Sequence, residues 1–131
     1  MISFFMAACL SVVSSGNTLD QTYADAYAKS IADQKPLMVV VASPACPACE
    51  VLKSTTITPM AQMGELSNVE VAVIDRDQQP ELVQKLTRGV RAVPQIIVFS
   101  RDSRGGWKRD RLMGYQPKQP VRSLIRKAIG G

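Results

Sequence analysis

The chain has 131 residues, of which 46% are hydrophobic and 21% are charged, a composition typical of one globular domain with its own core. Its net charge is +5, but aromatic residues make up only 5% of the chain, so a solvated basic face is favoured over a nucleic-acid interface, with steering of acidic partners as the functional alternative. The chain contains no histidine and only three cysteines, which argues against a closed four-ligand zinc site.

Residues 1–16 form an apolar segment that ends in small side chains. This pattern is typical of the hydrophobic part and cleavage end of a secretory signal, and the segment is too short to span a membrane. The basic start of such a signal is missing, because no Lys or Arg precedes Lys29. The alternative is an apolar N-terminal strand or helix of the folded protein.

The sequence is therefore divided into a signal-like segment, 1–16, and a domain, 17–131. This division favours an exported protein, in the bacterial periplasm or outside the cell, with a cytoplasmic location as the alternative. Cleavage after Ser15 would remove Cys9 and leave two cysteines in the mature chain.

The domain is expected to begin with a helix from Leu19 to about Asp33. Thr18 suits the N-cap, and Gln21, three residues later, completes a capping box. The next run, residues 36–42, is rich in β-branched side chains and is bounded by prolines. This run predicts a buried strand.

The stretch Cys46-Pro47-Ala48-Cys49 follows this strand and begins a second predicted helix. Pro47 suits the first helical position, because its missing N–H would have no partner there. Cys46 is then expected to cap the helix, where unpaired N–H groups and the helix dipole favour the thiolate, the reactive form of cysteine. Cys49 returns to the same face one turn later, within disulfide reach. The pair is predicted to exchange a disulfide with another protein.

Two other interpretations of the cysteine pair compete with this one. A CxxC stretch is also half of a zinc site, but the chain offers only Cys9 as a further ligand of the usual kind. A purely structural disulfide closing so short a loop would restrain little entropy of the unfolded chain. The position between a strand and a helix favours the redox-active pair.

The rest of the chain alternates helices and strands. The helix that starts at the cysteines is expected to continue to Thr56, where Thr58-Pro59 breaks it, and Thr58 is expected to cap a short helix from Pro59 to about Leu66. The remaining predicted elements are a strand over 69–75, a helix over 80–86 with Gly89 at its C′ position, a strand over 95–99 that starts after Pro94, a strand over 107–113 after a Gly105-Gly106 turn, and a helix over 117–129.

This order predicts an α/β fold with a central mixed sheet of about four strands, flanked by helices, and with an extra N-terminal helix. The alternating front part implies a parallel βαβ unit, and the closing hairpin implies an antiparallel pair.

From about Thr18 to its end, the chain resembles the thioredoxin-fold family. The resemblance rests on the CxxC stretch after a strand, on Val73-Ile74-Asp75 before a loop, on the Gly89–Pro94 run ahead of a strand, and on Gly114 late in the chain. Two segments look less like classical thioredoxin: the helix before Lys35-Pro36-Leu37 and the long segment between Cys49 and Pro59. They are more similar to the exported thioredoxin-like reductases and to the periplasmic carrier domain of membrane disulfide-reducing transporters.

The resemblance implies a thiol–disulfide oxidoreductase that acts on protein thiols and disulfides and receives electrons from an upstream dithiol donor. It implies that Cys46 attacks, that Cys49 resolves, and that the Val93–Pro94 bond is cis. Placed beside the cysteines, this bend would leave the Val93 backbone free to pair with an extended substrate strand. The residues expected to contact substrate are Pro44, Ala45, Pro47, Ala48, Val93 and Pro94, with Met113 nearby.

Three positions depart from the family pattern. Ala45 stands where thioredoxins usually carry tryptophan. Val40 and Val71 stand where thioredoxins carry a buried Asp and a Lys that help to deprotonate the resolving thiol. Proton transfer at Cys49 is then expected to run through water or Glu50, and the mixed disulfide is expected to resolve more slowly than in a typical thioredoxin.

The direction of electron flow depends on opposing effects. A stabilised Cys46 thiolate makes the protein more oxidising, whereas the nearby Glu50 opposes this by like charge; the resemblance favours a reductase. No cofactor or metal is expected, because the two sulfurs carry the electrons. The protein is also expected to bind no nucleic acid, to have no stable membrane span and to be a monomer. The competing hypothesis is a non-catalytic thioredoxin-fold module for partner docking or chaperone-like binding.

Overall fold

The computed structural model describes residues 19–130, so the signal-like segment, Cys9 and Thr18 lie outside the described residues. A mixed four-stranded sheet forms the centre of the fold, with the strand order β2-β1-β3-β4. The strands are β1 (Leu37–Ala42), β2 (Glu70–Asp75), β3 (Gln95–Arg101) and β4 (Trp107–Met113). β1 pairs in parallel with β2 and antiparallel with β3, and β4 pairs antiparallel with β3. The predicted mixed α/β sheet is confirmed.

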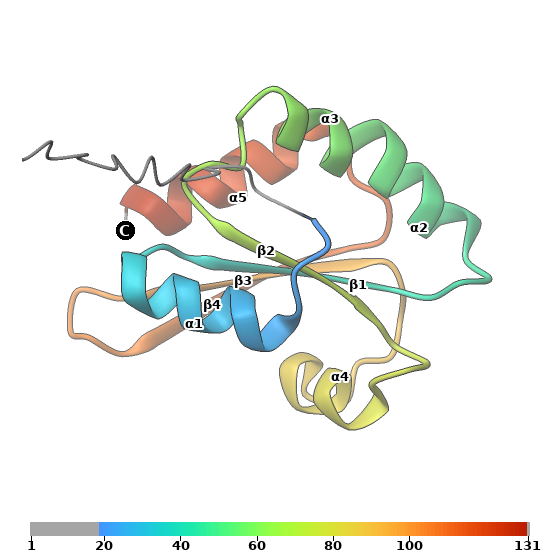
Figure 1. The fold of residues 1–131 in the computed structure, drawn as a ribbon, viewed down its shortest axis with the longest axis horizontal. Helices are drawn as coiled ribbons and strands as arrows, with labels where there is room; N and C mark the ends of the chain where they lie inside the picture. The colour runs from blue at the N-terminus through green and yellow to red at the C-terminus, as the bar shows by residue number, and fades with distance from the viewer. Residues whose placement is uncertain (1–18, 131) are drawn as a thin grey trace, which may run out of the picture.

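Helices cover both faces of this sheet (Figure 1). One face carries α1 (Tyr23–Asp33) and α4 (Pro80–Thr87), and the other carries α2 (Pro47–Leu52), α3 (Thr58–Gln62) and α5 (Lys118–Gly130).

β1 is buried along its whole length, because both of its faces are covered. Met38 and Val40 point into the core under α2, α3 and α5. Val39 and Val41 point into the core under α1 and α4. Covered on both sides, the strand has an unbroken apolar sequence instead of an alternating one.

The start of α1 differs from the prediction. The helix begins at Tyr23 and not at Leu19, and its N-cap is Thr22, whose Oγ1 accepts a hydrogen bond from the Asp25 N–H at 3.1 Å. Gln21 does not complete a capping box, because its Nε2 donates to the Val71 carbonyl at 2.9 Å on β2. β2 is an edge strand, so this amide occupies a carbonyl that no neighbouring strand can reach.

Pro59 does not break the helix that follows the cysteines, contrary to the prediction. A π-helical turn, η1 (Lys53–Ile57), joins α2 directly to α3. Thr58 has helical backbone angles and no capping bond from its side chain, and its N–H donates to the Lys53 carbonyl five residues earlier. The wider turn makes room for the proline ring, which would otherwise clash with the preceding turn. The helix then ends at Gln62 instead of near Leu66.

The remaining elements agree with the prediction to within one or two residues. α4 ends at Thr87, and Arg88 and Gly89 follow with left-handed φ values of 54° and 84°. The Gly89 N–H donates to the Gln84 carbonyl five residues earlier at 3.0 Å, the bond made by the residue that follows a left-handed residue at a helix end, here Arg88. Within residues 19–130, none of the helices has the length and apolar character needed to cross a membrane.

Candidate active site

The cysteine pair lies where β1 ends and α2 begins. Cys46 is the N-cap of α2, with extended backbone angles, and Pro47 takes the first helical turn. The Sγ of Cys46 accepts a hydrogen bond from the Cys49 N–H at 3.1 Å. The two cysteines are joined by a disulfide, with Cα atoms 5.2 Å apart. The predicted cap and the predicted disulfide reach are both confirmed.

The two sulfurs differ in their access to solvent. Cys46 is partly exposed, whereas Cys49 is 0% exposed. A thiol or disulfide from another molecule can therefore approach Cys46, while Cys49 can be reached only through its partner inside the protein.

The surface around Cys46 is apolar and open to solvent. Pro44, Ala45, Pro47 and Ala48, all predicted to contact substrate, are exposed there. None of them carries a charge or a side-chain hydrogen-bonding group, so this part of the surface offers only shape and apolar character to another molecule.

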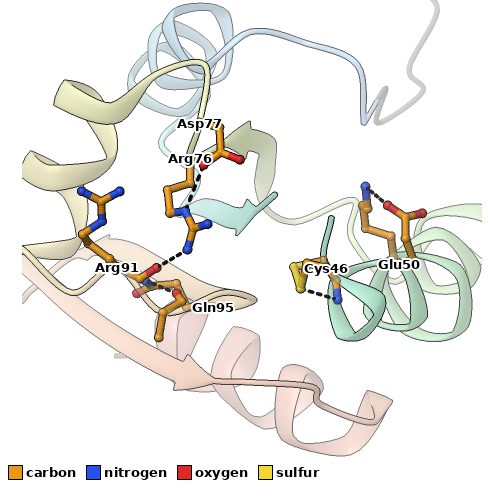
Figure 2. The surroundings of a disulfide bond; sticks show 9 residues. Cys46, Glu50, Arg76, Asp77, Arg91 and Gln95 are labelled. Atoms are coloured by element: carbon orange, nitrogen blue, oxygen red, sulfur yellow. Dashed lines mark hydrogen bonds and ion pairs between the residues drawn. A yellow bond between two sulfur atoms is a disulfide. The ribbon is translucent and has the colours of Figure 1, made fainter. Parts of the chain in front are cut away.

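The Val90–Pro94 loop lies at the same end of the sheet as the cysteines. It leads into β3, whose first residue, Gln95, pairs with Val41 near the end of β1. The Val93–Pro94 peptide bond is cis, and Val93 is partly buried while Pro94 is buried. Figure 2 shows Cys46 at the start of its helix, with the segment that carries Arg91 and Gln95 across from it.

Side chains that sequence reasoning missed hold this loop. Gln95 Nε2 donates to the carbonyls of Val90 and Ala92, and Arg76 Nη1 donates to the carbonyl of Arg91. A signal for Gln95 was present, because it is a lone polar residue at the start of an apolar strand. Arg76 gave no such signal, since an arginine in a loop after a strand is usually a solvated charge.

Glu50 is turned away from the cysteines. Its carboxylate forms an ion pair with Lys53 at 2.9 Å on the exposed side of α2, and among residues 19–130 it makes no hydrogen bond to either sulfur. Both side chains line a groove of about 410 Å³ between the start of α2 and the end of β2, together with Asp75. The groove is wide enough to bring water close to the start of the helix.

The positions of the missing thioredoxin-type Asp and Lys are filled by apolar core. Val40 and Val71 are each 1% exposed and belong to the cluster packed beneath α2, α3 and α5. No ionisable side chain from these two positions therefore reaches the buried side of the cysteine pair. Within the described part of the chain, no group of three or more His, Cys, Asp or Glu side chains is placed to hold a metal ion.

Comparison with known proteins identifies the family. Residues 23–129 match the model of the thioredoxin-like domain family. The M-type thioredoxin of maize (Zea mays) chloroplasts is 26% identical over 100 residues, which cover 76% of this chain and 55% of the relative. The chain thus spans about half the length of that curated relative.

Solved structures agree at the level of the fold. A thioredoxin from Thermus thermophilus matches with a TM-score of 0.67 at 23% identity, over 82% of this chain and 84% of that one. A chloroplastic thioredoxin z matches with a TM-score of 0.65 at 19% identity, over 85% and 93% of the two chains. The family model covers most of the chain, and these neighbours share its architecture. The chain therefore has the thioredoxin fold and belongs to the thioredoxin-like domain family.

Proposed function

We propose that the chain is a protein thiol–disulfide oxidoreductase that works as a reductase, with Cys46 as the attacking thiol and Cys49 as the resolving thiol. The observation that carries the proposal is the asymmetric disulfide at the start of α2, which joins an accessible N-capping Cys46 to a fully buried Cys49. Membership of the thioredoxin-like domain family supports it.

The first step is attack by reduced Cys46 on a substrate disulfide. The Cys49 N–H, 3.1 Å from the Cys46 sulfur in the disulfide form, and the positive end of the helix dipole favour the thiolate. The thiolate forms a bond to one substrate sulfur, the substrate S–S bond breaks, and the other substrate sulfur leaves as a thiolate that takes up a proton.

The second step is resolution by Cys49. This thiol loses its proton, attacks the Cys46 sulfur and releases the second substrate thiol, so that two electrons have moved to the substrate and Cys46 and Cys49 are joined again. An upstream dithiol then reduces the pair by the same exchange in reverse. No group beyond the two sulfurs has to accept electrons.

Substrate recognition would use the backbone of Val93. Among the described residues, neither its N–H nor its carbonyl makes a hydrogen bond, so both are free to pair with an extended segment beside the substrate disulfide. Met113 lies opposite Gln95 on β4 and is 43% exposed. With the small apolar residues around Cys46, it favours segments with apolar side chains.

Proton transfer at Cys49 would be slow in this protein. Val40 and Val71 offer no acid or base, so the proton would leave through water, with the carboxylate of Glu50, which lines the groove, proposed to help. We also propose that the protein is exported, on the basis of the apolar 1–16 segment and the resemblance to exported reductases, and that it acts as a monomer.

Reduction of insulin by dithiothreitol tests the function. The wild-type protein is expected to accelerate insulin precipitation, Cys46→Ser to abolish the acceleration, and Cys49→Ser to accumulate a mixed disulfide with its target. Absence of acceleration, with no loss on Cys46→Ser, would instead support a non-catalytic binding module.

Equilibration with glutathione tests the direction of electron flow. A reduction potential near the value of about −270 mV found for thioredoxin is expected of a reductase, whereas a value near −120 mV is that of a strong oxidant. The second result would contradict the reductase assignment and leave the exchange chemistry intact.

A further inference from the structure

The carbonyl groups of the Val90–Pro94 loop are almost all occupied by other parts of the protein. Gln95 Nε2 donates to Val90 at 3.0 Å and to Ala92 at 2.9 Å. Arg76 Nη1 donates to Arg91 at 2.9 Å. The Gly114 N–H donates to Pro94 at 2.8 Å. Within this loop, the carbonyl of Val93 is the one left without a partner in the described structure.

Gln95 holds the loop from inside the protein. Its side chain is 0% exposed, and because both of its partners are carbonyls, the amide must present its NH₂ group to them. The other end of the amide, Oε1, is buried and makes no hydrogen bond in the described structure. A buried acceptor without a partner costs stability, and an apolar side chain serving only to pack would avoid that cost. We therefore attribute the presence of Gln95 at this position to the two hydrogen bonds that its NH₂ group donates to the loop.

Arg76 holds the same loop from outside and ties it to the cysteine side. Its backbone N–H donates to Ala42, the last residue of β1, at 2.8 Å. Its guanidinium donates to the Arg91 carbonyl and also contacts the Asp77 carboxylate at 3.3 Å. One residue thus connects the end of the strand that leads to Cys46 with the loop across from it (Figure 2).

We propose that Gln95 and Arg76 are positioning residues that fix the Val90–Pro94 loop so that Val93 is its single open pairing edge. Their bonds occupy the carbonyls of Val90, Arg91 and Ala92. Within the described structure, Val93 is then the one residue of the loop whose N–H and carbonyl are both open. An incoming strand that pairs with both groups has one register available, and its disulfide is held in one place relative to Cys46. Neither side chain contacts the reacting sulfurs. The inference rests on the proposed function, because it concerns how that reaction selects an extended protein substrate.

The test compares a protein disulfide with a small one. Insulin presents a backbone to Val93, whereas 5,5′-dithiobis(2-nitrobenzoate) has none, so the second probe reports only on the thiol. Gln95→Met keeps the length of the side chain and removes both donors, and Arg76→Met removes the outer bond. Arg104→Met, in the exposed β3–β4 turn, is the matched control for loss of a positive charge.

The expected result is a split between the two probes. Each of the Gln95 and Arg76 variants should raise the KM for insulin by about tenfold, the range set by loss of one or two internal hydrogen bonds. Each should change kcat and the rate with the small disulfide by less than about twofold. Arg76→Lys, which keeps a donor, should recover most of the loss, and Arg104→Met should behave like the wild type.

Other outcomes separate the positioning role from the proposed function. An active wild type whose Gln95 and Arg76 variants reduce insulin normally would overturn the positioning role and leave the proposed function standing. An equal loss on both probes, in parallel with a lower melting temperature, would show a structural role and would also overturn it. A wild type that reduces neither probe would contradict the proposed function itself. Should Gln95→Met fail to fold, Arg76→Met, in a surface loop, gives the same decision.

Discussion

The two sides of the candidate site are held in different ways. On the cysteine side, the contacts are local: Cys46 accepts from the Cys49 N–H, and the Glu50 N–H donates to the Cys46 carbonyl at 3.2 Å. On the loop side, Arg76 arrives from the end of β2 and Gly114 from the end of β4. The proposed attacking thiol thus depends on one helical turn, whereas the proposed substrate edge depends on strands brought together by the whole sheet. Substitutions on the first side should alter chemistry, and substitutions on the second should alter substrate binding.

The largest effect is expected from a substitution that removes the sulfur chemistry on the cysteine side. Cys46→Ser should lower the rate of insulin reduction by more than about a thousandfold, because an alcohol cannot replace the thiolate in disulfide exchange. The loop should remain intact, so a peptide with the sequence of a substrate segment should still bind, as measured by isothermal titration calorimetry. Residual turnover close to that of the wild type would place the nucleophile elsewhere.

The next effect concerns the core that carries the cysteine helix. Leu52 is 0% exposed and lies one turn after Cys49, in the cluster beneath the helix. Leu52→Ala should lower the free energy of unfolding by about 2–5 kcal/mol, the usual cost of such a cavity, measured by urea denaturation of the oxidised protein. At a temperature where the variant is folded, its rate with a small disulfide should stay near that of the wild type, because the local cap bond does not involve Leu52. A large fall in that rate in the folded variant would show that the cap depends on core packing.

The sequence was sufficient for the parts of the fold and site that depend on local patterns. Prolines and β-branched runs located the strands, and Pro47 located the helix start that Cys46 caps. It failed where a distant partner decides the outcome. Gln21 does not cap α1, because its amide donates to the Val71 carbonyl on β2, 50 positions away in the sequence. The π-helical turn that accommodates Pro59 has no recognisable sequence pattern.

The same limit applies to the site. The resemblance predicted the Val93–Pro94 bend, but not the side chains that hold the loop around it. Arg76 and Arg91 are separated by 15 positions, and only the pairing of β1 with both β2 and β3 brings their segments together. Nothing in the local sequence marks such a contact.

A smaller effect is expected from the proton route on the cysteine side. Glu50→Gln removes the carboxylate at the groove beside α2, and should slow resolution of the mixed disulfide by about threefold, well below the effect of a directly bonded acid or base. Stopped-flow mixing of reduced protein with a disulfide peptide measures this step. A control variant, Glu65→Gln, changes a carboxylate that pairs with Arg122 at 2.8 Å on α5 and should leave the rate unchanged. Fast resolution in the wild type, together with no change in Glu50→Gln, would contradict the route.

The smallest expected effect concerns the free energy of unfolding at alkaline pH. It depends on Tyr23 of α1, a residue outside both sides of the candidate site. On α1, burial raises the pKa of Tyr23 above its ordinary value of 10.0, and the charge of the neighbouring Tyr27 adds to the shift. The unfolded chain therefore loses this proton first, so the contribution of Tyr23 is fully present below about pH 10 and is lost as the pH rises through the raised pKa. Tyr23→Phe should flatten the decline of the free energy of unfolding between about pH 9.5 and 11, measured by urea denaturation at each pH. Other titrating groups are common to both proteins and cancel in the difference. Equal slopes for the two proteins would show that burial of this ring does not disfavour its charged form.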